Sequence, residues 1–264
     1  MSKYLETAKL LFKTQLAYRF DTIINMLFTI SKIILAYILW GSIFENREIV
    51  SGFTLNGMIS YYIISSFIVQ LDQSSGTGGQ IAAEIRGGQF SKYMVRPINI
   101  FGYFASQTAG VSIFLLSFNL IAAVLWVFIF GVEFVITNNV MTILSAAVIT
   151  FLGLIFMMQL NFFTGILAFK FLDISIFTMI KDNVLQFVTG SLIPLAILPS
   201  FILDVMKYFP FYYVVYLPAM LFLGKNKNQI FTGIAVLLFW NISFWLINKI
   251  TYNRLRIKYD GVGI

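Results

Sequence analysis

Six apolar segments, each close to the length needed to cross a lipid bilayer, dominate the sequence. A bilayer's hydrocarbon core requires about 20 mostly apolar residues in helical form, because backbone groups in lipid must hydrogen-bond within their own segment. The segments run from Thr22 to Phe44, Thr54 to Leu71, Phe104 to Phe130, Val140 to Phe169, Ile174 to Leu198 and Ile230 to Ile247. Hydrophobic residues make up 59% of the chain and charged residues only 11%. We therefore predict an all-α integral membrane protein with six transmembrane helices.

The connection between the fifth and sixth segments is apolar as well, but it is too short for another crossing. Residues 209–223 form a stretch of about 15 residues, and Pro210 and Pro218 lie inside it. Pro194 and Pro199 interrupt the end of the fifth segment. We predict an irregular exit from that segment and, over residues 194–226, a re-entrant or interfacial hairpin on the outer side. A seventh crossing here would move the C-terminus to the other side of the membrane.

The positive charges indicate which side of the membrane each connection occupies. Cytoplasmic connections of membrane proteins carry an excess of Lys and Arg. With six crossings and a cytoplasmic N-terminus, thirteen of the 18 Lys and Arg lie on the inside and four on the outside, and Lys32 lies within the first segment. Both termini are therefore expected to be cytoplasmic. The net charge of +7 then reflects topology, and no nucleic-acid partner is needed to explain it.

The first 20 residues form an amphipathic pattern. At 100° per residue, one helix face carries the apolar residues and the other carries Glu6, Lys9 and Lys13. The apolar face consists of Tyr4, Leu5, Ala8, Leu11, Phe12 and Leu16. The interleaved charges do not fit a signal peptide. We predict an interfacial helix with Lys9 and Lys13 toward anionic lipid headgroups; the alternative is a continuation of the first transmembrane helix.

The chain has no His and no Cys, which removes several classes of chemistry. Disulfides, zinc sites with Cys or His ligands, thiol nucleophiles and Ser-His-Asp triads are all excluded. No paired carboxylates fall on one face of a transmembrane segment, so an intramembrane enzyme is the least favoured function. We predict that the chain is not an enzyme and binds no metal or cofactor of its own.

The most informative polar connection is the inner one, residues 72–100. Its glycine-rich start, Ser74 to Gly79, lacks the Lys-Ser/Thr ending of a phosphate-binding loop, so it is not expected to bind ATP. Residues 80–86 have a short helical pattern that Gly87-Gly88 can end in a left-handed turn. Residues 90–95 form a second short segment, which ends before Pro97. The pattern predicts a helix, a turn and a helix on the inner face.

This element has the side chains that a docking surface needs. We expect Phe90 and Tyr93 to fill a partner's pocket while Glu84, Arg86 and Arg96 orient the contact. The alternative is a solvated loop that only joins two transmembrane helices.

Polar side chains inside the predicted crossings are candidates for a translocation path. Lys32 lies near the middle of the first crossing, where it can face a polar path or extend along its own helix toward the interface. The amides are Asn119, Gln159, Asn161 and Asn241. They can either line a path or join helices by hydrogen bonds, and the second interpretation is the more common one for uncharged groups.

The stretch from Glu84-Ile85-Arg86-Gly87-Gly88 to Val95-Arg96-Pro97-Ile98 resembles a signature of ABC-2 type transporter permeases, the membrane subunits of ABC exporters. Three later stretches also resemble that family in order and spacing. They are Gly190 to Pro199, Phe209 to Pro218, and the tail from Arg256 to Gly263. The resemblance therefore covers nearly the whole chain, which would form a single ABC-2 transmembrane domain over residues 1–264.

The resemblance implies a permease that exports an amphiphilic or hydrophobic cargo, such as a drug, peptide, lipid or glycan, across a bacterial cell membrane. A cytoplasmic coupling helix in residues 72–100 would dock on a separate ATP-binding subunit, which would hold ATP and Mg. A second permease, identical or paralogous, would complete the transporter. The coupling residues would be Ile81, Glu84, Ile85, Arg86, Phe90, Tyr93, Arg96 and Pro97. The alternative from another class is a secondary carrier or channel driven by an ion gradient, although the carboxylates mostly lie at the ends of the predicted crossings.

Overall fold

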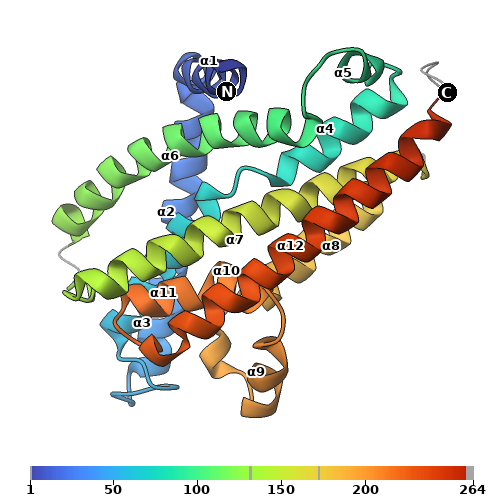
Figure 1. Ribbon diagram of the computed structural model, residues 1–264. Helices are drawn as coiled ribbons and strands as arrows, with labels where there is room; N and C mark the ends of the chain where they lie inside the picture. Colours follow the sequence, from blue (N-terminus) through green and yellow to red (C-terminus); the bar gives the residue numbers. More distant parts are fainter. Residues whose placement is uncertain (1, 131–132, 172, 260–264) are drawn as a thin grey trace.

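The computed structural model describes residues 2–130, 133–171 and 173–259, and within these ranges the chain is built from helices, with no β-strand (Figure 1). The α-helices are α1 (Ser2–Ala17), α2 (Arg19–Phe44), α3 (Leu55–Leu71), α4 (Ser75–Arg86), α5 (Ser91–Met94), α6 (Ile100–Phe130), α7 (Val140–Ile166), α8 (Ser175–Val188), α9 (Ser200–Met206), α10 (Phe211–Val214), α11 (Tyr216–Phe222) and α12 (Ile230–Leu255). Short 3-10 helices follow α7 (Leu167–Phe169) and α12 (Arg256–Lys258) and precede α9 (Leu195–Ile197) and α12 (Lys227–Gln229). The all-α prediction is confirmed.

Three helical stretches in the described part of the chain are long and apolar enough to cross a membrane. They are Ile100–Phe118, Val140–Phe169 and Lys227–Leu255. The second has the bounds predicted for the fourth crossing, and the other two overlap the predicted third and sixth crossings. The predicted first two crossings correspond to α2 and α3, whose ends lie within a few residues of those expected. α3 begins at Leu55 because the Thr54 hydroxyl accepts a hydrogen bond from the backbone N–H of Gly57 at 3.2 Å.

The predicted fifth segment is shorter as a helix than the sequence suggested. α8 has only 14 residues and ends at Val188, ten residues before Leu198. Gly190 then adopts a left-handed conformation with φ of 79°, which turns the chain out of the helix. The irregular exit is as expected, whereas the continuous helix to Leu198 is not formed.

The segment from α9 to α11 is a bent pair of helices. The α9 axis and the axis of residues 211–222 differ by 86°. Pro199 and Pro210 directly precede α9 and α10, and Pro218 lies in the first turn of α11, where a missing N–H costs little. Pro194 caps the short 3-10 helix before α9. α11 is buried almost completely against α3, α7 and Gly233 of α12. α9 has no buried residue. The second half of this bent pair therefore belongs to the interior of the protein, whereas the first half lies at its surface.

The N-terminal helix α1 packs along α6. Gly110 permits the contact, because a Cβ atom there would lie 2.3 Å from the carbonyl oxygen of Ala8. The rings of Phe12 and Phe114 meet edge to face at 5.6 Å. Leu5 and Leu16 remain more than half exposed on the same helix. The amphipathic helix is therefore formed, with part of its apolar face on α6 and part uncovered.

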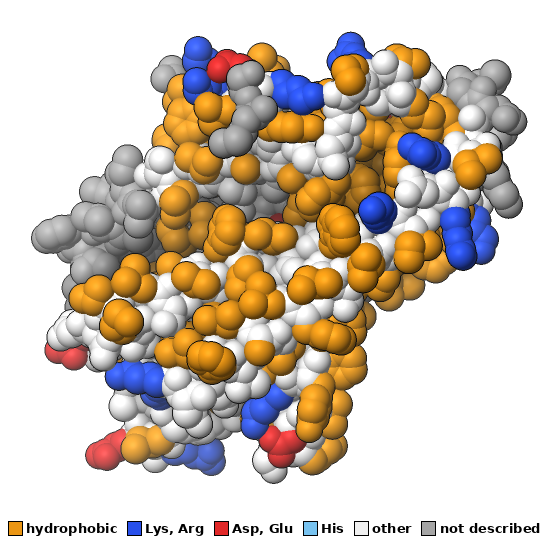
Figure 2. Space-filling view, in the orientation of Figure 1, with side chains coloured by type: hydrophobic (Ala, Val, Ile, Leu, Met, Phe, Trp, Pro, Cys, Tyr) orange, Lys and Arg blue, Asp and Glu red, His pale blue; other side chains and the backbone are white. Residues whose placement is uncertain are grey.

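The molecule has two charged ends and an apolar middle. α1, α4, α5 and the end of α12 lie toward one end, and α9 and the connection between α2 and α3 lie toward the other (Figure 1). Figure 2 shows Lys and Arg side chains at both ends of this face and mostly hydrophobic side chains between them. This distribution is what a protein that spans a bilayer requires.

Candidate functional site

The predicted helix, turn and helix between α3 and α6 is formed by α4 and α5. Gly88 has φ of 70°, and the backbone N–H of Phe90 reaches back to the carbonyl of Glu84 at 3.0 Å, which closes the end of α4. α4 begins earlier than the pattern indicated, at Ser75, so most of the glycine-rich stretch is helical. The reason lies in the contact of this stretch with α7.

α4 and α7 cross with their backbones in contact. A Cβ atom added to Gly78 would lie 2.9 Å from the carbonyl oxygen of Asn161, and one on Gly165 would lie 2.9 Å from the Cβ of Ile81. Small residues allow helices to approach in this way, and close approach increases their van der Waals contact. Ile81 and Ile85 are both buried against this crossing. These two predicted coupling residues thus attach α4 to a long transmembrane helix.

Glu84 faces α5. Its Oε1 atom accepts hydrogen bonds from the Tyr93 hydroxyl at 3.0 Å and from Lys92 Nζ at 3.3 Å. Burial and the neighbouring Glu84 carboxylate raise the pKa of Tyr93 well above its usual value, so Tyr93 stays a proton donor. The Oε2 atom of Glu84 is buried and has no hydrogen-bond partner among the described residues. Glu84 therefore holds the two short helices together.

The predicted insertion of Phe90 and Tyr93 into a partner's pocket does not fit the structure. Phe90 has no exposed surface and Tyr93 has 3%. The Phe90 ring packs edge to face on Phe169 at 5.1 Å and on Tyr259 at 6.2 Å, so the end of α7 and the C-terminal tail supply its pocket. Burial of these aromatic rings within one chain satisfies the same hydrophobic driving force that a partner would have satisfied.

The exposed tip of this element consists of different residues. Val95 is 82% exposed, and Arg86, Arg96 and Pro97 are exposed as well. Arg86 lies 3.7 Å from Asp173, whose pKa is held below its usual range by hydrogen bonds from Ser175 and, less strongly, by Arg86. The predicted coupling residues include Arg86, Arg96 and Pro97 but not Val95. An apolar residue that directly precedes an Arg-Pro pair is at the end of a helix, and this position could have indicated that the Val95 side chain is exposed.

A series of polar side chains connects the residues just before α4 to α7 and α8. Asp72 accepts hydrogen bonds from the backbone and hydroxyl of Ser74, and Asn161 Nδ2 donates to the same hydroxyl oxygen at 2.7 Å. Lys181 Nζ donates to Asn161 Oδ1 and lies 3.0 Å from Asp182. Asn161 was predicted as a path residue. In this structure it joins three helical elements through both ends of its amide.

Gln159 and Asn241 form a second interhelical contact. Gln159 Nε2 donates to Asn241 Oδ1 at 2.7 Å, and Asn241 Nδ2 donates to backbone carbonyls of Leu152 and Leu237. Asn248, which the sequence analysis did not select, donates to the Gln159 carbonyl at 3.0 Å. In this structure these amides join α7 and α12 by hydrogen bonds. The side chains of Lys32 and Asn119 lie outside the part of the chain that the structure describes.

Comparison with known proteins covers most of these elements. The model of the family described as "ABC-2 family transporter protein" matches residues 30–263, which include α3 to α12 and most of α2. No curated protein matches the chain.

Proposed function

Because this chain belongs to the ABC-2 family of transporter proteins, we propose that it is the permease of an ATP-driven exporter. Membership makes the chain a membrane transport subunit, which is not itself a catalytic domain and works with an ATP-binding subunit. The proposed cargo is amphiphilic or hydrophobic, and it moves out of the cell with energy from ATP and Mg held by the partner. A second permease, identical or paralogous, completes the assembly in the cell membrane.

The proposed topology has six crossings by α2, α3, α6, α7, α8 and α12, with both termini cytoplasmic. Its support is the position of α1, α4, α5 and the end of α12 toward one end of the molecule (Figure 1). That end carries most of the Lys and Arg that the positive-inside rule assigns to the cytoplasm. The bent pair of α9 to α11 then forms the outer re-entrant hairpin, and α8 crosses with the help of the irregular residues that follow it.

The observation that carries this proposal is the construction of α4 as a lever. The exposed tip of the α4 and α5 element consists of Arg86 at the end of α4 and of Val95 and Arg96 after α5. The start of α4 lies against α7 at Gly78 and Gly165, where the two backbones leave no space for a Cβ atom. Interfaces and packed cores transmit displacement as rigid units. A push from an ATP-binding subunit on the tip therefore reaches a transmembrane helix directly.

A cross-linking experiment tests the contact. The chain has no cysteine, so Val95→Cys creates a single thiol at the tip. The matched control is Ile49→Cys, which is 66% exposed in the connection between α2 and α3. After reaction with a maleimide photo-cross-linker in membranes of the native host, we expect Val95→Cys alone to be joined to a protein that contains a phosphate-binding loop.

Two results contradict the proposal. One is cross-linking of Val95→Cys only to lipid or to proteins without a nucleotide-binding motif. The other is cargo movement in proteoliposomes that hold this chain, a proton or sodium gradient and no ATPase, which would favour the secondary carrier instead.

A further inference from the structure

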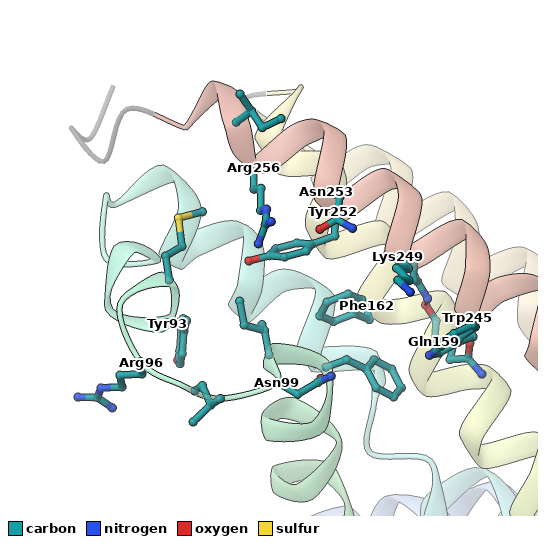
Figure 3. A pocket seen from close by; sticks show the side chains of 16 residues that line it. Tyr93, Arg96, Asn99, Gln159, Phe162, Trp245, Lys249, Tyr252, Asn253 and Arg256 are labelled. Atoms are coloured by element: carbon teal, nitrogen blue, oxygen red, sulfur yellow. Dashed lines mark hydrogen bonds between the residues drawn. The ribbon is translucent and has the colours of Figure 1, made fainter.

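A cavity of about 730 Å³ lies between α12, α7 and the connection from α5 to α6 (Figure 3). This volume is within the range of sites that bind small ligands. The coupling proposal uses neither this space nor the α12 side chains around it. The end of α12 and the connection from α5 to α6, which line this cavity, lie at the same end of the molecule as α4 and α5 (Figure 1).

The cavity wall formed by the end of α12 is basic. Lys249 and Arg256 line it, and the lining residues that the structure describes include no Asp or Glu. Within the described part of the chain neither cation forms an ion pair; Lys249 Nζ lies 5.2 Å from the Trp245 ring centre and the Arg256 guanidinium 5.3 Å from that of Tyr252. Arg96 also borders the cavity, but its side chain extends away from the other labelled residues (Figure 3). Two cations are thus available to an anion.

The cavity floor offers hydrogen-bond acceptors. Gln159 and Asn248 line the cavity and are 4% and 6% exposed. Both use their amide nitrogens within the protein, whereas Gln159 Oε1 and Asn248 Oδ1 are buried and accept no hydrogen bond from the described residues. A buried acceptor without a donor costs free energy. Because both oxygens are buried, a ligand hydroxyl would supply the donor once the side-chain amide turns toward the cavity.

An apolar surface continues from the cavity along α12. Trp245 lines the cavity and is 53% exposed, and Ile242, one turn earlier on the same face, is 60% exposed. Trp is typical of the boundary between hydrocarbon and headgroups. An acyl chain that follows Ile242 would place its headgroup beside Lys249.

We propose that this cavity binds the headgroup of an anionic phospholipid with a hydroxyl-bearing head, of which phosphatidylglycerol is the simplest example. The phosphate lies between Lys249 and Arg256, and a headgroup hydroxyl donates to the amide oxygen of Gln159 or Asn248. An acyl chain lies along Trp245 and Ile242. Phosphatidylcholine fits less well. Its trimethylammonium group has no N–H to donate, and its positive charge would face those of Lys249 and Arg256. The inference requires a membrane location but is independent of ATP coupling and of cargo.

Native mass spectrometry of the detergent-purified full chain tests this site. Phosphatidylglycerol, phosphatidylcholine and the soluble head sn-glycerol-3-phosphate are each added at equal concentration. We expect one tightly retained phosphatidylglycerol per chain. Lys249→Gln with Arg256→Gln should weaken its binding roughly 10- to 30-fold, since each cation near an anionic lipid contributes to affinity.

The matched control carries Lys227→Gln with Arg254→Gln, which removes the same charge from exposed positions of the α12 region outside the cavity. This control should retain the lipid. The conservative pair Lys249→Arg with Arg256→Lys keeps both positive charges and should therefore bind the lipid as the unsubstituted chain does. Equal retention of phosphatidylcholine, equal binding of sn-glycerol-3-phosphate, or equal loss in the control would each overturn the proposal.

Discussion

A Cβ atom on Gly165 of α7 would lie 3.1 Å from the Cα atom of Gly78 of α4, so these two helices meet backbone against backbone. The contact explains why a glycine-rich stretch with low helix propensity is helical here. It also brings the first half of α4 against the α7 backbone, so a larger residue at Gly78 or Gly165 would force the two helices apart. Four predictions test this arrangement and its surroundings.

Adjacent glycines of α4 should respond in opposite ways to alanine. Gly78→Ala places a methyl group against the Asn161 carbonyl and should destabilise the protein by about 1–3 kcal/mol. Gly79→Ala meets no atom within 4 Å and should be neutral or stabilising by up to about 1 kcal/mol, because Ala is the better helix former. Thermal unfolding in detergent measures both. Equal melting temperatures would show that the crossing is looser than described.

Glu84→Lys should uncouple ATP hydrolysis from transport. The new ammonium group would face Lys92 and would leave the Tyr93 hydroxyl without its acceptor, so α5 should separate from α4. We expect transport per ATP hydrolysed to fall by roughly fivefold or more, with normal membrane insertion. Glu48→Lys, at an exposed position between α2 and α3, is the control. An unchanged ratio in Glu84→Lys would remove Glu84 from the coupling role.

Asn161→Leu should weaken the junction of α4, α7 and α8. The substitution removes one hydrogen-bond partner from the buried Ser74 hydroxyl and one from the partly buried Lys181 ammonium group. The loss of a partner from a buried polar group costs about 1–3 kcal/mol. Asn183→Leu serves as the comparison, because Asn183 is exposed and, within the described part of the chain, its side chain donates to the carbonyl of Met179 in its own helix. Chemical unfolding should separate the two variants, and similar stabilities would argue against this series of polar side chains.

The proposed topology predicts opposite accessibility for two single cysteines. A membrane-impermeant maleimide should label Ile49→Cys in intact cells and Val95→Cys only in inside-out vesicles. Both positions are exposed, so burial does not explain a difference between them. The proposed crossing between these two positions is α3. Labelling of both cysteines from the same side would therefore contradict the proposed topology.

Local sequence features were sufficient for much of the fold. Apolar length located α2, α3, α6, α7 and α12, since a helix in lipid needs a minimum number of residues. Gly87-Gly88 and the five prolines predicted where helices end or begin, because the backbone freedom of Gly and the fixed φ of Pro act at their own positions. The same reasoning overestimated α8, whose apolar residues continue beyond the point where Gly190 turns the chain.

The sequence by itself determined that this chain is helical, apolar and charged at its ends, and it identified the α4 and α5 element as the segment of interest. Tertiary structure alone decided which side of that element is free. Phe90 turns inward because the 3-10 helix after α7 and the tail supply apolar surface for it, and Tyr93 turns inward onto the rings of Tyr103 and Phe104 in α6. Tertiary structure also paired Gln159 with Asn241, 82 residues away. Periodicity ranks the faces of one helix, whereas burial depends on neighbours that only the folded chain brings together.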